Sequence, residues 1–155
     1  MEKNKSAMGE FDEKTFNYIH LKCIPMKKSA KGMVMNFDRE KLDRLVAEAI
    51  VVNPVPLRGI EVKFLRQVMG LSLNKAGTPL GITASAIFYW ESAPETRLTI
   101  VNEVAFRSLA AERLGFMISG KLSSLLGKET PPTIEISLGA DEKKGRTPKT
   151  RRSKK

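Results

Sequence analysis

The strongest structural signal in the chain lies between Phe64 and Glu91, in the segment FLRQVMGLSLNKAGTPLGITASAIFYWE. Apolar residues recur there at the three- and four-residue spacing of amphipathic helices. Gly81 stands where a helix end needs a residue that tolerates a positive φ, and the Thr83 hydroxyl can cap the helix that follows. The segment therefore predicts the end of one helix, a second short helix, a tight turn and a third helix that ends in Trp-Glu.

Regular structure is also predicted on both sides of this segment. Two β-prone runs within residues 16–37 predict a small β-hairpin. Asp38 is a suitable N-cap for a helix over Arg39–Val52, and a Pro-Val-Pro sequence ends that helix. Downstream, an apolar pattern predicts a helix over Leu98–Leu114, and then a short helical piece and a weak strand over Thr133–Leu138.

Charge is concentrated at the C-terminus of the chain. The formal net charge is +10, and Asp141–Lys155 contributes +6 of it from eight basic and two acidic residues. A disordered basic arm of this kind strengthens nonspecific binding to nucleic acid by releasing counterions. The single cysteine fits a reducing cytoplasm. Because no apolar run approaches the roughly 20 residues that span a bilayer and no signal peptide is visible, we expect a cytoplasmic protein without a membrane partner.

Two short helices joined by a tight, glycine-containing turn have the form of a helix-turn-helix, which places a helix where it can enter the major groove of DNA. The sequence PLRGIEVKFLRQVMGLS at 56–72 resembles the entry to the helix-turn-helix domain of MqsA-type antitoxins, a branch of the lambda-repressor/Cro-like fold. The sequence LGITASAIFYWE at 80–91 resembles the turn and recognition helix of that fold. The resemblance implies a dimeric DNA-binding repressor, and the antitoxin members also bind a toxin through another segment.

The resemblance also assigns residues to DNA. Three positions on the third helix correspond to base-facing ones, a fourth lies beside them and Thr83 starts the helix, while two cations fall where the sugar–phosphate backbone approaches. The full set is Lys75, Thr83, Ala84, Ser85, Phe88, Tyr89 and Arg97. None of the base-facing residues is Arg, Asn or Gln, so specificity should depend on apolar contacts and DNA shape. Each residue also has a simpler role as a cap, a half-exposed aromatic or a solvated charge.

Several positions depart from the family pattern. The paired CxxC motifs of an N-terminal zinc module are missing, because Cys23 is the only cysteine, and we expect no metal. Leu73 stands where the second helix usually begins with Gln. Gly77 and Pro79 lie inside that helix, where such residues cost about 1 and about 3 kcal/mol. The only histidine, His20, has no acidic partner nearby in the sequence, and no phosphate-binding glycine motif is present, so we predict no enzyme, no catalytic residues and no cofactor.

The predicted fold class is α+β: a small N-terminal β-hairpin plus helix, then a mainly helical Cro-like helix-turn-helix domain, then a disordered basic tail. The predicted divisions are a flexible N-terminus at 1–14, the hairpin and helix as a dimer or partner module at 15–56, the DNA-binding domain at 57–115, a C-terminal extension at 116–140 and the tail at 141–155.

The predicted function is sequence-specific transcriptional regulation on double-stranded DNA, as a repressor acting as a homodimer through the Leu98–Leu114 helix. A small toxin encoded next to it would make it an antitoxin. Two alternatives stand beside this prediction. One is a protein-interaction adaptor with a degenerate helix-turn-helix, and the other is an architectural or RNA-binding protein driven by its basic tail. A repressor should prefer one site over random DNA by a large ratio, whereas a tail-driven binder should not.

Overall fold

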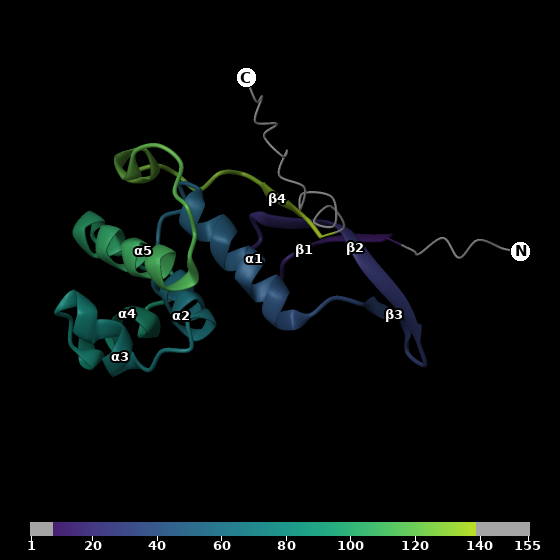
Figure 1. The fold of residues 1–155 in the computed structure, drawn as a ribbon, viewed down its shortest axis with the longest axis horizontal. Coiled ribbons are helices and arrows are strands. Elements are labelled where there is room, and N and C mark those ends of the chain that lie inside the picture. Colours follow the sequence, from purple (N-terminus) through teal and green to yellow (C-terminus); the bar gives the residue numbers. More distant parts are fainter. Residues whose placement is uncertain (1–7, 139–155) are drawn as a thin grey trace, which may run out of the picture. The chain divides into compact units, whose positions relative to one another are not determined.

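The computed structural model describes residues 8–138 of the chain. Within that range it is a mixed α/β protein with five α-helices and a four-stranded sheet (Figure 1). The described residues divide into two compact units, one with residues 8–37 and 135–138, the other Asp38–Ile134. The first contains the sheet and the second contains the helices. The predicted mixture of helix and sheet is confirmed, and the tail predicted at 141–155 lies outside the described residues.

Strand β2 (Ile19–Ser29) is the centre of the sheet. It pairs antiparallel with β1 (Met8–Asp12) and with β3 (Gly32–Met35), and β4 (Ile134–Ser137) also pairs with it. β2 and β3 are the predicted hairpin, and β4 confirms the predicted strand near the end of the described chain. The buried apolar side chains of this unit include Phe16, Tyr18, Ile19, Leu21 and Ile24.

A flexible N-terminus is predicted over residues 1–14; the structure instead places strand β1 at Met8–Asp12, and residues 1–7 lie outside the described residues. The backbone of β1 pairs with β2 although most of its side chains are exposed. The register shifts opposite Glu10, where Lys22 and Cys23 together face one residue, and Cys23 takes a positive φ of 52°. Because β1 is held by backbone pairing and not by an apolar stripe, composition gives no sign of it.

The helical unit contains five α-helices and two short 3-10 turns. They are α1 (Arg39–Val52), α2 (Gly59–Val68), α3 (Leu73–Gly77), η1 (Thr78–Leu80), α4 (Ala84–Ser92), α5 (Ile100–Leu114) and η2 (Leu122–Leu125). Helix α2 contacts α1, α4 and α5, and α3 packs on α4 (Figure 1). Fully buried side chains in this core include Ile50, Val62, Leu65, Ala76, Ile87 and Phe106.

Capping residues set the ends of these helices. The Asp38 carboxylate accepts a hydrogen bond from the Glu40 backbone N–H at 3.0 Å, which confirms the predicted start of α1. Helix α5 begins at Ile100, two residues later than predicted, because Thr99 is its N-cap. Gly115 ends α5 in the left-handed region, at a φ of 72°.

Helix α1 belongs to the helical unit, whereas the sequence-based division places residues 39–52 with the hairpin in a 15–56 module. The physical reason is that α1 packs against α2 and α5. Two buried residues of α5, Arg107 and Glu103, strengthen this connection.

Arg107 joins α5 to the C-terminal end of α1. Its side chain is fully buried, and Nη2 donates to Glu103 Oε1 at 3.2 Å. The same carboxylate oxygen accepts from the Leu57 backbone N–H at 2.9 Å. The guanidinium also donates to four backbone carbonyl oxygens: Ile50 at 2.9 Å, Val51 at 2.6 Å, Asn53 at 3.1 Å and Val55 at 2.5 Å. Two of these acceptors, the Ile50 and Val51 carbonyls, belong to the last turn of α1, where carbonyls lack partners within the helix.

Candidate functional site

The α3–α4 segment is shaped by short-range hydrogen bonds that its sequence encodes. At the start of α3, Ser72 Oγ accepts from the Lys75 backbone N–H at 3.2 Å. Gly81 ends η1 in the left-handed region, at φ 65° and ψ 28°, and Thr83 Oγ1 accepts from the Ala86 backbone N–H at 3.1 Å. Gly81 and Thr83 therefore act as the predicted turn residue and N-cap.

Gly77 and Pro79 shape the end of α3. The α-helix stops at Gly77, and the chain continues as the 3-10 turn η1 with Pro79 near its start. A Cβ added at Gly77 would lie 2.1 Å from the Ile82 carbonyl oxygen and 3.3 Å from Ile87 Cδ1. The glycine therefore lets α3 approach the turn and α4 more closely than any side chain would allow.

Arg66 holds the end of α4 against α2. Arg66 Nε and Nη2 donate to the two Glu91 carboxylate oxygens at 2.8 and 2.7 Å, and Nη1 donates to the Leu71 carbonyl at 2.9 Å. Hydrogen bonding to Glu91 raises the pKa of Arg66, and the Glu91 side chain is only 8% exposed. Glu91 is the only charged residue of α4, so this pairing leaves no unpaired charge on the helix.

Four exposed side chains lie on one face of α4, at spacings of three, four and seven residues: Ser85, Phe88, Tyr89 and Ser92. We call them the α4 stripe. The two aromatic residues are 62% and 74% exposed, in chain order. The Ser92 hydroxyl donates to the Phe88 carbonyl at 2.8 Å.

The inner side of α4 has one buried residue, Ile87, and Trp90 is half-buried. The backbone of Trp90 nevertheless makes a close contact, because a Cβ added at Gly59 would lie 2.0 Å from its carbonyl oxygen. A second glycine thus sets the approach of α2 to α4.

The structure brings together three of the predicted DNA-contacting residues, Ser85, Phe88 and Tyr89, on the α4 stripe. Thr83 is occupied as the helix cap, and Ala84 is half-buried at the start of the helix.

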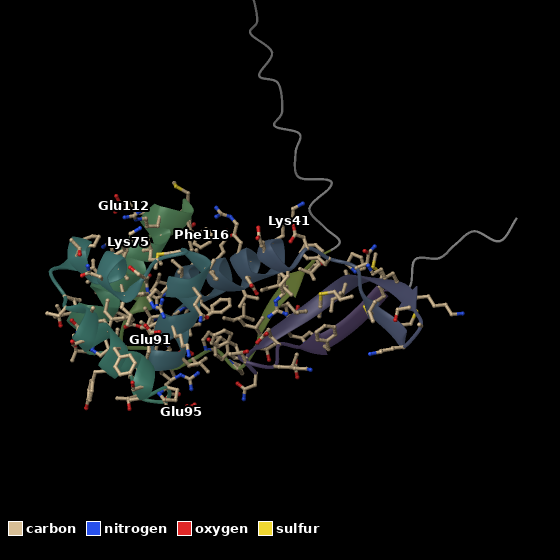
Figure 2. The ribbon with its side chains drawn as sticks, turned by 90° about the horizontal axis from the view of Figure 1, so that it is seen from below. Lys41, Lys75, Glu91, Glu95, Glu112 and Phe116 are labelled. Carbon is tan, nitrogen blue, oxygen red and sulfur yellow. The ribbon has the colours of Figure 1, made fainter. Side chains whose placement is uncertain are left out.

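The two predicted phosphate contacts lie elsewhere. Arg97 is in the loop after α4, where it donates to the Lys128 carbonyl at 3.4 Å. Lys75 is at the edge of the helical unit opposite to Glu95 (Figure 2). It lines a hollow of about 400 Å³ with Gly70, Leu71, Thr78, Pro79 and Arg113.

Sequence reasoning missed two residues near these positions. Ser92 completes the α4 stripe, and its position seven residues after Ser85 is a periodic signal that could have found it. Arg113 comes to Lys75 from α5, and no local pattern connects two residues so far apart in the sequence.

A separate cluster surrounds His20 on β2, which has no acidic partner nearby in the sequence but receives two from β1. Its Nδ1 lies 2.7 Å from Asp12 Oδ1 and its Nε2 lies 2.6 Å from Glu10 Oε1. Hydrogen bonds to Asp12 and then to Glu10 raise the pKa of His20 above its usual 6.5. Nearby, Lys22 and Glu135 pair at 2.7 Å and join β2 to β4. The His20 side chain therefore links β2 to β1.

We expect the His20 pKa, read from its imidazole NMR resonances, to lie above 6.5. A pKa raised by folding stabilises the folded state below the unfolded pKa, and this contribution is lost as the pH rises through the folded pKa. The double variant Glu10→Gln with Asp12→Asn should return the pKa toward 6.5 and remove that pH dependence. Glu40→Gln, in the helical unit, is the control. An unchanged His20 pKa in the double variant would contradict the assignment.

Residues 8–138 contain no group of three or more His, Cys, Asp or Glu side chains that could hold a metal ion. No helix in that range is both long and apolar enough to cross a membrane. Comparison with protein-family models, curated proteins and solved structures finds no match.

Proposed function

We propose that α2, α3 and α4 form a Cro-like helix-turn-helix and that the protein is a sequence-specific DNA-binding transcriptional regulator, acting as a repressor. The observation that carries the proposal is the α4 stripe, an exposed polar and aromatic face on the helix that follows a tight glycine turn. A helix presented in this way can insert its outward face into the major groove of DNA.

The charge distribution supports an approach to DNA. Because Glu91 is paired with Arg66, α4 presents no free carboxylate to the phosphates. The N-terminal end of α4 adds partial positive charge from its backbone N–H groups. Much of the formal net charge of +10 lies in the tail, outside the described residues, and adds a sequence-independent attraction through counterion release.

We propose a homodimer that forms through the start of α5, where Ile100 and Val101 are 57% and 77% exposed. A two-fold dimer would read an inverted repeat, with its half-sites spaced by a turn of the duplex. In the antitoxin version of this proposal, the sheet unit is the module that holds the toxin. Such a regulator would act in the cytoplasm.

We expect the double variant Ser85→Ala with Tyr89→Ala to relax the choice of DNA sequence. Each lost contact should be worth about 1 kcal/mol, at the low end for base discrimination, so the specificity ratio should fall about tenfold or more. The melting temperature should barely change, because both side chains are exposed. The measurement is competition binding between a site selected from randomised duplexes, expected to be an inverted repeat, and scrambled duplexes.

The matched control is Ser123→Ala with Met117→Ala, which removes one exposed hydroxyl and one exposed apolar side chain outside α4. It should keep the specificity ratio of the wild type. If the α4 double variant is folded and equally specific, its stripe does not read DNA. The exposed aromatics would then favour a protein-interaction adaptor.

A further inference from the structure

The α4 stripe lacks the side chains that make two hydrogen bonds to one base. It has no guanidinium, ammonium or amide group, and it offers two aromatic rings and three hydroxyls. The Ser92 hydroxyl is already engaged with the Phe88 carbonyl at 2.8 Å. Ser85 and Tyr89 therefore supply the remaining hydroxyl donors, and the apolar rings supply most of the exposed surface.

The major groove has one prominent apolar feature, the C5-methyl group of thymine. A methyl on C5 of cytosine occupies the same position on its pyrimidine ring. Phe88 and Tyr89 are adjacent in sequence and largely exposed, so both rings are free to cover such a group. The O4 atom of thymine lies next to the methyl group. It is a hydrogen-bond acceptor, and a tyrosine hydroxyl can donate to it.

We propose that Phe88 and Tyr89 determine specificity by recognising the C5-methyl group of a 5-methylpyrimidine in the major groove. This inference rests on the proposed DNA-binding function. The neutral stripe fits this ligand because Glu91, the one carboxylate of α4, is withdrawn into its pair with Arg66 and does not repel the phosphates. Covering each methyl with an aromatic ring should strengthen binding about fourfold, as expected from the burial of one carbon.

The test uses the full chain and a site selected from a randomised duplex pool that contains ordinary thymine and cytosine. Each thymine of the selected site is then replaced by deoxyuridine, which removes only the methyl. At the sensitive positions, T·A pairs are also replaced by C·G and by 5-methyl-C·G. We expect uridine to weaken binding about fourfold for each contacted methyl. If 5-methylcytosine restores affinity relative to cytosine, the protein recognises the methyl group of any 5-methylpyrimidine. If it does not, the protein recognises the methyl group of thymine alone. Either result supports the proposal.

Variants assign the reading to residues. Phe88→Ala and Tyr89→Ala should each bring the thymine-to-uridine affinity ratio toward one at the position that the residue covers. Met117→Ala removes an apolar side chain that is 86% exposed outside α4, and it should leave every ratio unchanged.

Three results would overturn the inference, and they are distinguishable. Equal affinity for thymine and uridine at every position of an enriched site removes the methyl reading and leaves the proposed function intact. An undiminished ratio in both aromatic variants removes the residue assignment and favours a protein partner for the stripe. A pool that yields no enriched sequence removes the proposed function together with the inference.

Discussion

Arg107→Met should lower the free energy of unfolding by about 3–5 kcal/mol, the usual cost of breaking a buried ion pair from one side. The substitution keeps an unbranched apolar stem but removes every hydrogen bond that the buried guanidinium donates. The Glu103 carboxylate would stay buried and would still accept from the Leu57 N–H, while four backbone carbonyls would lose a partner. Denaturant unfolding followed by circular dichroism measures the change.

The matched control is Arg113→Met, which makes the same change at an exposed position of the same helix and should stay within about 0.5 kcal/mol of the wild type. Arg107→Lys should recover little stability, because a single ammonium cannot reach both the carbonyls and Glu103 as the planar guanidinium does. An Arg107→Met protein as stable as the Arg113→Met control would show that the α1–α5 connection does not depend on these hydrogen bonds.

The parts of the fold that could be predicted are those whose signals are local in the sequence. Asp38 caps the helix that begins at the next residue, and Gly81 and Thr83 form a turn within three residues. The β2–β3 hairpin follows from two β-prone runs on either side of a short turn. In each case the energetic cause is a backbone conformation or a hydrogen bond between neighbouring residues, which the sequence pattern records directly.

The parts that could not be predicted depend on partners distant in the sequence. Arg107 reads as an ordinary helix-surface arginine until α5 is packed against the end of α1. The acidic partners of His20 come from β1, a polar strand with no apolar alternation. In a sequence pattern, a charged residue that is paired through tertiary contacts looks the same as a charged residue exposed to water. The spacing of apolar residues therefore cannot distinguish the two.

In the candidate site, too, some features follow from local sequence and others depend on residues distant in the sequence. The spacing of Ser85, Phe88 and Tyr89 on one face follows from the helical period and needs no tertiary information. Arg66 and Glu91 come from different helices, and their ion pair gives the charged residue near the end of α4 a partner that the sequence pattern does not show. The position of Lys75 relative to α4 is likewise set by packing. The structure places Lys75 in the hollow that it lines with Arg113, away from the α4 stripe.

Gly77→Ala should destabilise the protein by about 3 kcal/mol or more, since overpacking against backbone has little room to relax. On helix propensity alone the same change would stabilise a helix interior by about 1 kcal/mol, so the expected sign is reversed. The reversal arises because the new Cβ would lie 2.1 Å from the Ile82 carbonyl oxygen. The Ile82 N–H also donates to the Gly77 carbonyl at 3.0 Å, so α3 cannot move away without losing that bond. Thermal and denaturant unfolding measure the loss.

Ser108→Ala is the control, because it introduces the same residue at an exposed position of α5, where alanine should stabilise by a few tenths of a kcal/mol. A Cβ at position 77 would displace the turn that contains Ile82 and Thr83, and Thr83 is the cap of α4. The Gly77→Ala molecules that still fold should therefore present the α4 stripe at a changed angle. We therefore expect a large loss of affinity for a selected DNA site, accompanied by a smaller loss of helical content measured by circular dichroism. A Gly77→Ala protein that is more stable than the wild type would show that α3 does not approach the turn this closely. The glycine would then be a cost to the second helix and not the feature that sets the position of the third.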